Sequence, residues 1–160
     1  MNLESTSIDS NKIDSNDIER PSYTLITDPE LLPVLVEQWQ KASFLAIDTE
    51  FVREKTYYHK LGLIQVSNGV ICAAIDPIRI KNLNPFLDLV RNQNTVKVFH
   101  AARQDLEILH RLCDGAIQPV FDNQIAASVV GWGSQISFAK IVYKVLGKKI
   151  NKLDWLKLDY

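Results

Sequence analysis

Short apolar segments separated by polar breaks follow one another along the chain from residue 23 onward. Apolar runs flanked by turn residues indicate strands, whereas apolar residues spaced three and four positions apart indicate helices. The pattern predicts strands over residues 23–26, 44–47, 61–67, 70–75, 95–99 and 117–121. It predicts helices behind Asp28-Pro29 and over residues 84–91, 102–113, 122–130 and 137–146.

The connections between these segments indicate the fold class. Asn68-Gly69 lies between two predicted strands and is a strong hairpin signal, since both residues tolerate a positive φ. Three strands with hairpin-type connections come first, and helices alternate with strands after them. This order predicts an α/β fold with a mixed sheet, three antiparallel strands then two parallel ones, and helices on both faces.

Two details of the helices can be predicted in the same way. Pro33 lacks a backbone N–H, which favours a first helix that begins a few residues after Pro29. In the helix over residues 102–113 we expect Leu106, Leu109 and Leu112 to face inward.

The first twenty residues differ from the rest of the chain. Residues 1–20 hold five acidic and two basic side chains among repeated serines and asparagines. Such a segment buries too little apolar surface to offset its ordering entropy, so we expect a disordered polar arm. The folded part would then cover residues 21–160.

Composition narrows the classes of protein without selecting one. The chain has 160 residues, 46% of them apolar, and a formal net charge of −1. It holds no apolar stretch long enough for a membrane helix, and residues 1–20 do not read as a secretory signal. Two cysteines are too few for a disulfide scaffold, and we expect both Cys72 and Cys113 to be small buried residues. A soluble cytoplasmic protein without membrane partners is therefore expected.

Three acidic residues are candidates for chemistry. Asp48 and Glu50 lie two apart at the end of the strand over residues 44–47, so their carboxylates share a face. Asp105 lies one helical turn after the strand that ends near His100. If that strand is a neighbour of the strand over residues 44–47 in the sheet, Asp105 comes close to Asp48 and Glu50. Such carboxylates repel one another unless a cation lies between them, and oxygen ligands suit Mg²⁺ or Mn²⁺. The alternatives are that Asp48 and Glu50 are acidic only because they are solvated at a strand end, and that Asp105 is acidic only because the helix dipole favours negative charge in a first turn.

The segments around these residues carry a resemblance. The chain reads Asp-Thr-Glu-Phe-Val-Arg from Asp48, then Thr-Tyr-Tyr from Thr56 and Leu-Gly-Leu-Ile-Gln from Leu61; later it reads Phe-His-Ala-Ala-Arg-Gln-Asp-Leu-Glu from Phe99 and Phe-Asp-Asn-Gln from Phe121. These segments resemble the ribonuclease D family of 3′→5′ exonucleases, in the DEDD superfamily. The resemblance extends over about residues 23 to 156. The predicted order of elements suits the ribonuclease-H-like fold of that family.

The resemblance implies two-metal hydrolysis of the 3′-terminal phosphodiester of RNA, with Mg²⁺ or Mn²⁺ as the two divalent cations. Asp48 would bridge both ions, Glu50 would bind the ion that holds the attacking water, and Asp105 would hold the second ion through water. The implied partner is RNA with a free 3′ end, and precursors of the tRNA type are implied as substrates.

Three further residues are candidates for substrate binding. Phe51 and Gln65 could contact the terminal nucleotide by stacking and by hydrogen bonding, and His100, in the motif that begins at Phe99, is the third candidate. A buried aromatic ring, a satisfied amide and a structural histidine are the alternatives. Asp122 is expected to cap a helix, and Asn123 stands where the family has threonine.

The family's last motif, a tyrosine followed four residues later by aspartate, is not found in the chain, which ends Leu-Asp-Tyr at Tyr160. We therefore expect residues 21–160 to be a partial exonuclease domain that lacks its C-terminal part. Self-association, or a second polypeptide that supplies the missing helix, is then expected. Alternatives are an inactive fragment, an RNA-binding remnant, or a proofreading relative that acts on DNA.

Overall fold

The computed structural model describes residues 23–52 and 60–150. The chain divides into two compact units, one of Arg20–Phe138 and one of Met1–Glu19 with Ala139–Tyr160. The predicted arm over residues 1–20 and the Thr-Tyr-Tyr motif over residues 56–58 lie outside the described residues. Of the second unit, only residues 139–150 are described.

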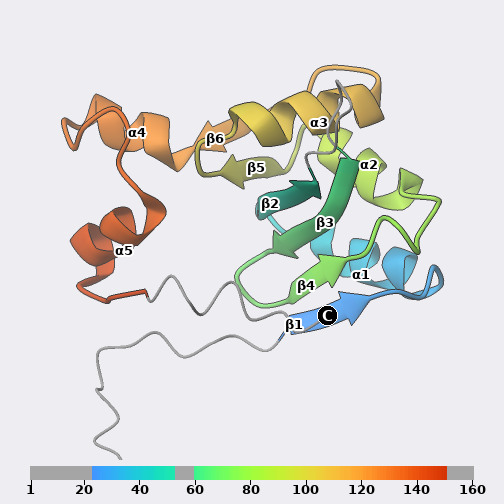
Figure 1. Cartoon of the computed structure of the whole chain (residues 1–160). Helices are drawn as coiled ribbons and strands as arrows, with labels where there is room; N and C mark the ends of the chain where they lie inside the picture. The colour runs from blue at the N-terminus through green and yellow to red at the C-terminus, as the bar shows by residue number, and fades with distance from the viewer. Residues whose placement is uncertain (1–22, 53–59, 151–160) are drawn as a thin grey trace, which may run out of the picture. The chain divides into compact units, whose positions relative to one another are not determined.

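A mixed sheet forms the centre of the first unit (Figure 1). Its strands are β1 (Tyr23–Ile26), β2 (Phe44–Val52), β3 (Lys60–Ser67), β4 (Cys72–Ile75), β5 (Val96–Phe99) and β6 (Val120–Asp122). They lie in the order β1-β4-β3-β2-β5-β6. Strands β2, β3 and β4 pair antiparallel, and β5 and β6 add to β2 in parallel. The predicted mixed sheet is confirmed, and β1 extends it by pairing in parallel with β4.

Three strands differ in length from the prediction by two residues or more. Strand β2 does not end at Ile47 but pairs with β3 as far as Val52 opposite Lys60. Its pairing with β5 covers only Phe44 to Ala46, so its second half has β3 alone as a ladder partner. Strand β4 begins only at Cys72, and β6 begins only at Val120 because Pro119 has no N–H for a ladder.

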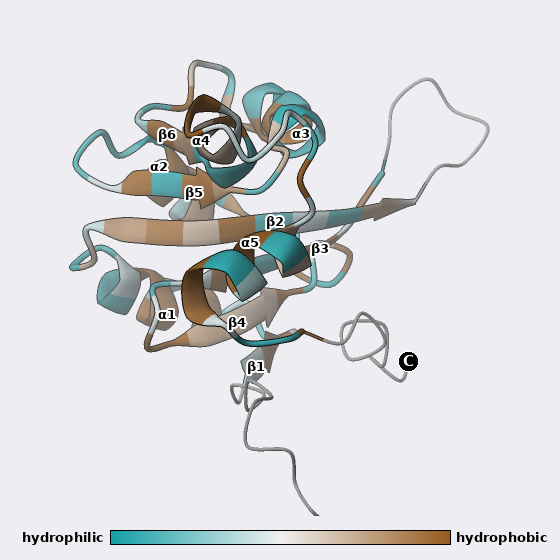
Figure 2. Ribbon diagram, turned by 90° about the vertical axis from the view of Figure 1, so that its left-hand side faces the viewer, coloured by the Kyte–Doolittle hydropathy of each residue, from teal (hydrophilic) through white to brown (hydrophobic). Residues whose placement is uncertain are grey.

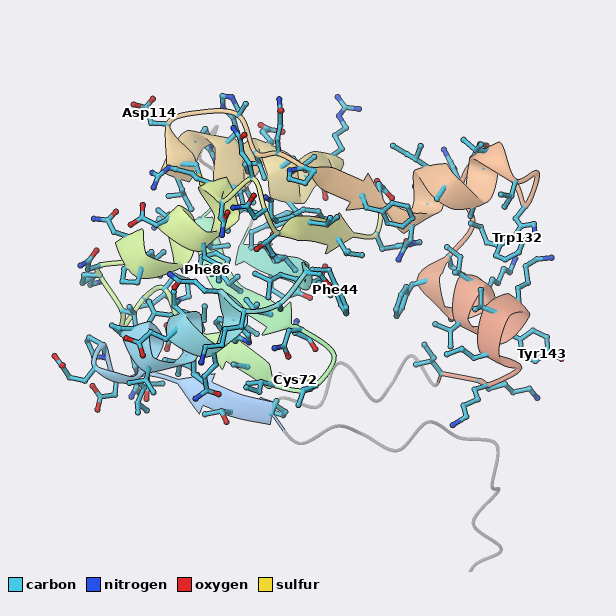
Figure 3. All side chains as sticks on the ribbon, turned by 180° about the vertical axis from the view of Figure 1, so that it is seen from behind. Phe44, Cys72, Phe86, Asp114, Trp132 and Tyr143 are labelled. Atoms are coloured by element: carbon cyan, nitrogen blue, oxygen red, sulfur yellow. The ribbon has the colours of Figure 1, made fainter. Side chains whose placement is uncertain are left out.

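The helices follow the predicted ranges closely. They are α1 (Leu31–Trp39), α2 (Asn84–Arg91), α3 (Arg103–Cys113), α4 (Asn123–Val129) and α5 (Phe138–Leu146). Helix α1 begins at Leu31, so Pro33 falls in its first turn, where a missing N–H costs no intrahelical hydrogen bond. Helix α3 ends at Cys113, and the residue that follows it, Asp114 (labelled in Figure 3), adopts the left-handed conformation with φ 48°.

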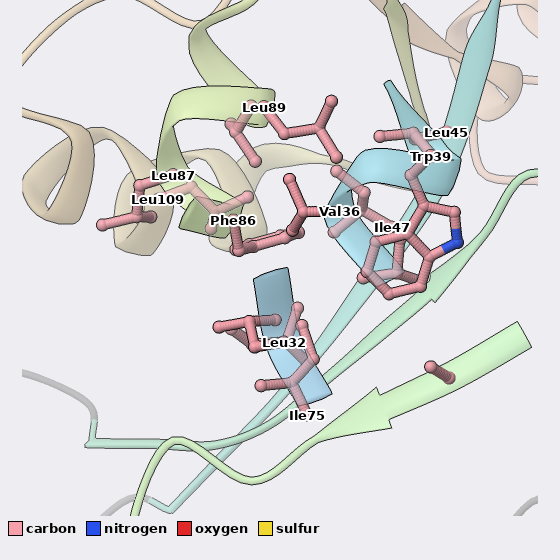
Figure 4. Close-up of a cluster of buried hydrophobic side chains, with 14 of the residues drawn as sticks. Leu32, Val36, Trp39, Leu45, Ile47, Ile75, Phe86, Leu87, Leu89 and Leu109 are labelled. Atoms are coloured by element: carbon pink, nitrogen blue, oxygen red, sulfur yellow. The ribbon is translucent and has the colours of Figure 1, made fainter. Parts of the chain in front are cut away.

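Helices α1, α2 and α3 cover one face of the sheet and enclose the main core (Figure 4). The core residues labelled there come from α1 (Leu32, Val36, Trp39), β2 (Leu45, Ile47), β4 (Ile75), α2 (Phe86, Leu87, Leu89) and α3 (Leu109). Burial of this apolar surface is the main favourable contribution to folding of the unit.

Helix α3 turns a different stripe inward from the one we predicted. Leu109 is buried and Leu106 packs against the core, but Leu112 is exposed. The buried positions are Asp105, Ile108, Leu109 and Cys113, which share one face at helical spacing. An acidic side chain thus occupies an inward position. Cys113 is buried as predicted, whereas Cys72 is only half-buried.

In the part of the chain that the structure describes, no helix is both long enough and apolar enough to cross a membrane.

Candidate active site

Strand β2 is apolar over its first four residues, polar from Asp48 to Glu50, and apolar again over its last two residues (Figure 2). The alternation of side chains in a strand places Asp48 and Glu50 on one face and Thr49 on the other. Accordingly, Asp48 and Glu50 are exposed and Thr49 is buried. The shared face of the two carboxylates is as predicted, but they lie within the strand rather than beyond its end.

Helix α3 brings Asp105 to the same strand. Its carboxylate oxygen Oδ1 accepts hydrogen bonds from the backbone N–H of Thr49, at 3.0 Å, and from the Thr49 hydroxyl, at 2.6 Å. The N–H of Thr49 lies past Ala46, where the pairing of β2 with β5 ends. Asp105 of α3 therefore provides the hydrogen-bond partner for β2 beyond the point where β5 stops pairing with it. This point lies at the carboxyl end of the parallel strands, where open α/β sheets place ligand sites.

The three carboxylates affect one another electrostatically. Partial desolvation of its carboxyl group raises the pKa of Asp48 to about 6, and repulsion from Asp105 and Glu50 adds to this effect. Burial also raises the pKa of Asp105, although the hydrogen bonds from Thr49 oppose the shift. Negative charge is thus crowded where a bound cation would offset the repulsion.

The fit of this site to divalent cations can be judged residue by residue. Asp48 and Glu50 present oxygen ligands on one exposed face, as Mg²⁺ or Mn²⁺ would require. Asp105 has Oδ1 bound to Thr49. Within residues 23–52 and 60–150, no three histidine, cysteine, aspartate or glutamate side chains gather closely enough to hold a metal ion. The arrangement therefore fits a divalent cation bound directly by Asp48 and Glu50, with Asp105 contacting it through a water molecule.

The structure places Gln65 beside the carboxylates. Asp48 and Gln65 are register partners across the antiparallel pair β2 and β3, so their side chains project on the same face. Gln65 is half-buried, and its amide can donate or accept hydrogen bonds next to Asp48.

Phe51 lies where the register between β2 and β3 shifts, between Glu50 and Phe51. Gly62 is the extra residue on β3 at this point, since Glu50 pairs with Leu63 and Phe51 with Leu61. Bulges of this kind increase the local twist and redirect side chains near functional sites. Phe51 is half-buried there.

His100 follows the last residue of β5 and is half-buried. In its protonated form His100 would lower the pKa of Asp48, so it belongs to the same electrostatic neighbourhood. Its Nδ1 lies 2.5 Å from Oδ1 of Asn123, and its ring meets that of Phe138 edge-on at 5.6 Å between centroids. Asn123 and Phe138 were not among the predicted site residues. The sequence offered one signal for Asn123, which lies inside the Phe-Asp-Asn-Gln motif that begins at Phe121.

Asp122 caps α4, as predicted. Its carboxylate accepts hydrogen bonds from the backbone N–H groups of Gln124 and Ile125 in the first turn of that helix. It also accepts from Ala101 and Ala102, directly after His100. One side chain therefore connects the segments that lead into α3 and α4.

Comparison with known proteins shows the family of the chain. A family model described as a 3′-5′ exonuclease matches residues 23–157. The chain is 40% identical over 139 residues to ribonuclease D of Shewanella sp. (strain ANA-3), covering 84% of this chain and 36% of that protein. It is 41% identical over 136 residues to ribonuclease D of Bartonella henselae, covering 82% of this chain and 34% of that protein. The chain thus spans about a third of the length of these curated relatives.

Solved structures show the same likeness. Escherichia coli RNase D, an exoribonuclease involved in structured RNA processing, matches with a TM-score of 0.79 and 34% identity, over 85% of this chain and 36% of that one. The catalytic core of RRP6 from Trypanosoma brucei matches with a TM-score of 0.74 and 26% identity, over 86% of this chain and 38% of that one. The resemblance predicted from the motifs is confirmed: the chain belongs to the 3′-5′ exonuclease family, as a relative of ribonuclease D.

Proposed function

We propose that this chain is the carboxylate-bearing part of a cytoplasmic 3′→5′ exoribonuclease that removes nucleotides from the free 3′ end of RNA. The observation that carries the proposal is the arrangement of Asp48 and Glu50 on one face of β2, with Asp105 bonded to the residue between them. The family and the named relatives support hydrolysis of a phosphodiester as the reaction.

Each carboxylate has a separate task in this proposal. Two bound Mg²⁺ or Mn²⁺ ions supply activation of water and stabilisation of the charge on the reacting phosphate. Asp48 and Glu50 hold the cations directly, because both carboxylates are exposed on the same face. Asp105 acts through water, because its Oδ1 already accepts two hydrogen bonds from Thr49.

Three neighbouring side chains are proposed to hold the terminal nucleotide. Gln65 lies opposite Asp48 and can donate a hydrogen bond from its amide to the substrate. Phe51 offers an aromatic face one residue beyond Glu50, on which a base can stack. His100 lies on the side of the site where α3 begins.

A second candidate function is RNA binding without hydrolysis. It is favoured by the finding that the described side chains include no cluster of three metal-ligating groups. A further polypeptide, or a second copy of this chain, that contributes another carboxylate would restore hydrolysis. Activity per mole of protein that rises with protein concentration would support such a contribution.

The test uses single-stranded RNA labelled at its 5′ end, incubated with the full chain and Mg²⁺ or Mn²⁺. We expect products that shorten stepwise from the 3′ end, and no products with Asp48→Asn or with a chelator. Equal shortening by Asp48→Asn would refute the site. Binding without shortening would favour the second candidate, and faster shortening of DNA of the same sequence would indicate a proofreading relative.

A further inference from the structure

His100 and Asn123 form a directed contact beside the candidate site. The ring atom Nδ1 of His100 lies 2.5 Å from the amide oxygen Oδ1 of Asn123. An amide oxygen can only accept a hydrogen bond, so Nδ1 must carry the hydrogen. In the neutral ring the other nitrogen, Nε2, then has a lone pair and accepts hydrogen bonds rather than donating them.

The backbone holds both residues of this pair in place. The Asp122 carboxylate accepts hydrogen bonds from four backbone N–H groups: those of Ala101, Ala102, Gln124 and Ile125. Two of these donors follow His100 directly and two follow Asn123 by one and two positions. A single carboxylate therefore fixes the spacing between the segments that carry the two side chains.

The backbone next to His100 is strained. Ala101 has a φ of 57°, in the left-handed region that a side chain with a Cβ disfavours. Its N–H is one of those bonded to Asp122, at 3.1 Å. Strained backbone at such a point persists only when its surroundings hold it, and it clusters at functional sites.

Phe138 provides a third constraint on the ring. Its ring meets the His100 ring at an interplanar angle of 61°, the edge-to-face arrangement that aromatic rings prefer. The imidazole is thus bonded at Nδ1 and packed by an aromatic ring. Rotation about its side-chain bonds would break one or both contacts.

The nature of the free nitrogen limits what His100 can bind. Phosphate oxygens carry no hydrogen at neutral pH, so they cannot donate to a lone pair on Nε2. A ribose hydroxyl can donate, and the 2′-hydroxyl distinguishes RNA from DNA. We propose that Asn123 is a positioning residue that keeps the hydrogen of His100 on Nδ1, so that Nε2 accepts a hydrogen bond from a hydroxyl of the terminal ribose. This inference rests on the proposed function for its substrate.

The first measurement is the position of the ring hydrogen, read from the ¹⁵N NMR signals of His100 in the full chain. We expect hydrogen on Nδ1 in the unaltered chain and in Asn123→Asp, which keeps an acceptor oxygen in the same place. In Asn123→Leu, which is of similar size and has no acceptor, we expect this preference to be lost. A hydrogen on Nε2 in the unaltered chain, or no change in Asn123→Leu, would overturn the proposal.

The second measurement compares binding of RNA and DNA of one sequence. It uses the Asp48→Asn background with Mg²⁺, so that hydrolysis does not consume the RNA. Loss of one hydrogen bond should reduce the preference for RNA about fivefold to tenfold in Asn123→Leu. His100→Ala should lose as much, and the double variant no more. Circular dichroism checks that each variant is folded.

The outcomes separate this inference from the proposed function. An unchanged preference for RNA in Asn123→Leu would overturn the hydroxyl contact even if the unaltered chain shortens RNA. An unaltered chain that neither binds nor shortens either nucleic acid would refute the proposed function and the hydroxyl contact together. In that case the NMR measurement alone decides whether Asn123 positions His100.

Discussion

Thr49 donates both its backbone N–H and its hydroxyl to one carboxylate oxygen of Asp105, at 3.0 and 2.6 Å. The two hydrogen bonds fasten the first turn of α3 to β2 at the residue between Asp48 and Glu50. Asp105 is only 7% exposed and Thr49 6%, so water cannot easily replace either bond. Thr49 therefore determines where the third carboxylate lies relative to the other two.

Replacing Thr49 tests this attachment. Thr49→Val keeps the shape of the side chain but leaves buried Asp105 with one hydrogen bond fewer, and such a bond to a charged group contributes about 1.5–3 kcal/mol. We expect a loss of that size in the free energy of unfolding, measured with urea. Thr49→Ser keeps the hydroxyl and should lose only about 0.8 kcal/mol for its methyl group. Equal losses in the two variants would contradict the proposed attachment.

The carboxylate cluster predicts opposite effects of Asp48→Asn with and without metal. Without metal, the variant should unfold at a higher temperature than the unaltered chain, because one repelling charge is gone. With Mg²⁺ a hundredfold above its Kd, the unaltered chain should gain about 2.7 kcal/mol, and the variant much less. Thermal unfolding in chelator and in Mg²⁺ measures both effects.

The control for this comparison is Asp114→Asn. Asp114 is an exposed acidic residue, and asparagine tolerates its left-handed conformation. It should respond to Mg²⁺ as the unaltered chain does. An Asp48→Asn variant that gains as much stability from Mg²⁺ as Asp114→Asn would show that Asp48 does not hold the metal.

Asp122 predicts a dependence of stability on acid. Partial burial works to raise the pKa of its carboxyl, but four backbone N–H donors outweigh this and lower the pKa below its ordinary 3.8. The ionised form therefore stabilises the folded state. This contribution is complete above the unfolded pKa and is lost as the pH falls below 3.8 through the lower folded value.

Asp122→Asn keeps an acceptor oxygen but cannot ionise. We expect it to be less stable than the unaltered chain at neutral pH and to approach it in acid. Urea unfolding between about pH 2 and pH 6 measures the difference, and other carboxyl groups cancel because both chains contain them. A difference that stays constant over this range would contradict the role of the charge.

Lys97 is a buried cation within β5. Its side chain is fully buried, and Nζ donates to the carbonyl oxygens of Thr95 at 2.7 Å, Asn92 at 2.8 Å and Gln118 at 2.5 Å. Burial lowers its pKa below the ordinary 10.5. The ammonium group thereby connects the loop before β5 with the loop before β6.

Lys97→Met tests this connection. The methionine fills similar space but leaves three carbonyl oxygens without their donor, each at a cost of about 1–3 kcal/mol where water does not replace it. We expect a loss of at least about 2 kcal/mol in the free energy of unfolding. Lys41→Met, at an exposed residue, should change the stability by less than about 0.5 kcal/mol. Similar losses in both variants would refute the structural role of Lys97.

Several features of the site could be predicted from local sequence. The period of two along β2 placed Asp48 and Glu50 on a common face, and this depends only on the geometry of one strand. The N-cap role of Asp122 also followed from sequence, because the side chain bonds to N–H groups two and three residues ahead. Such relationships hold within one element, so the linear order of residues contains them.

The tertiary structure alone decided the rest. The sequence showed Lys97 as a polar position in a strand, and Leu112 as part of an apolar stripe; the first is buried and the second exposed. Neither outcome follows from periodicity, because it depends on which carbonyl oxygens and side chains a neighbouring element brings close. The same is true of the hydrogen bonds from Thr49 to Asp105 and of the contact between His100 and Asn123. These pairs are 56 and 23 residues apart, and only the packing of α3 and α4 beside the sheet brings them together.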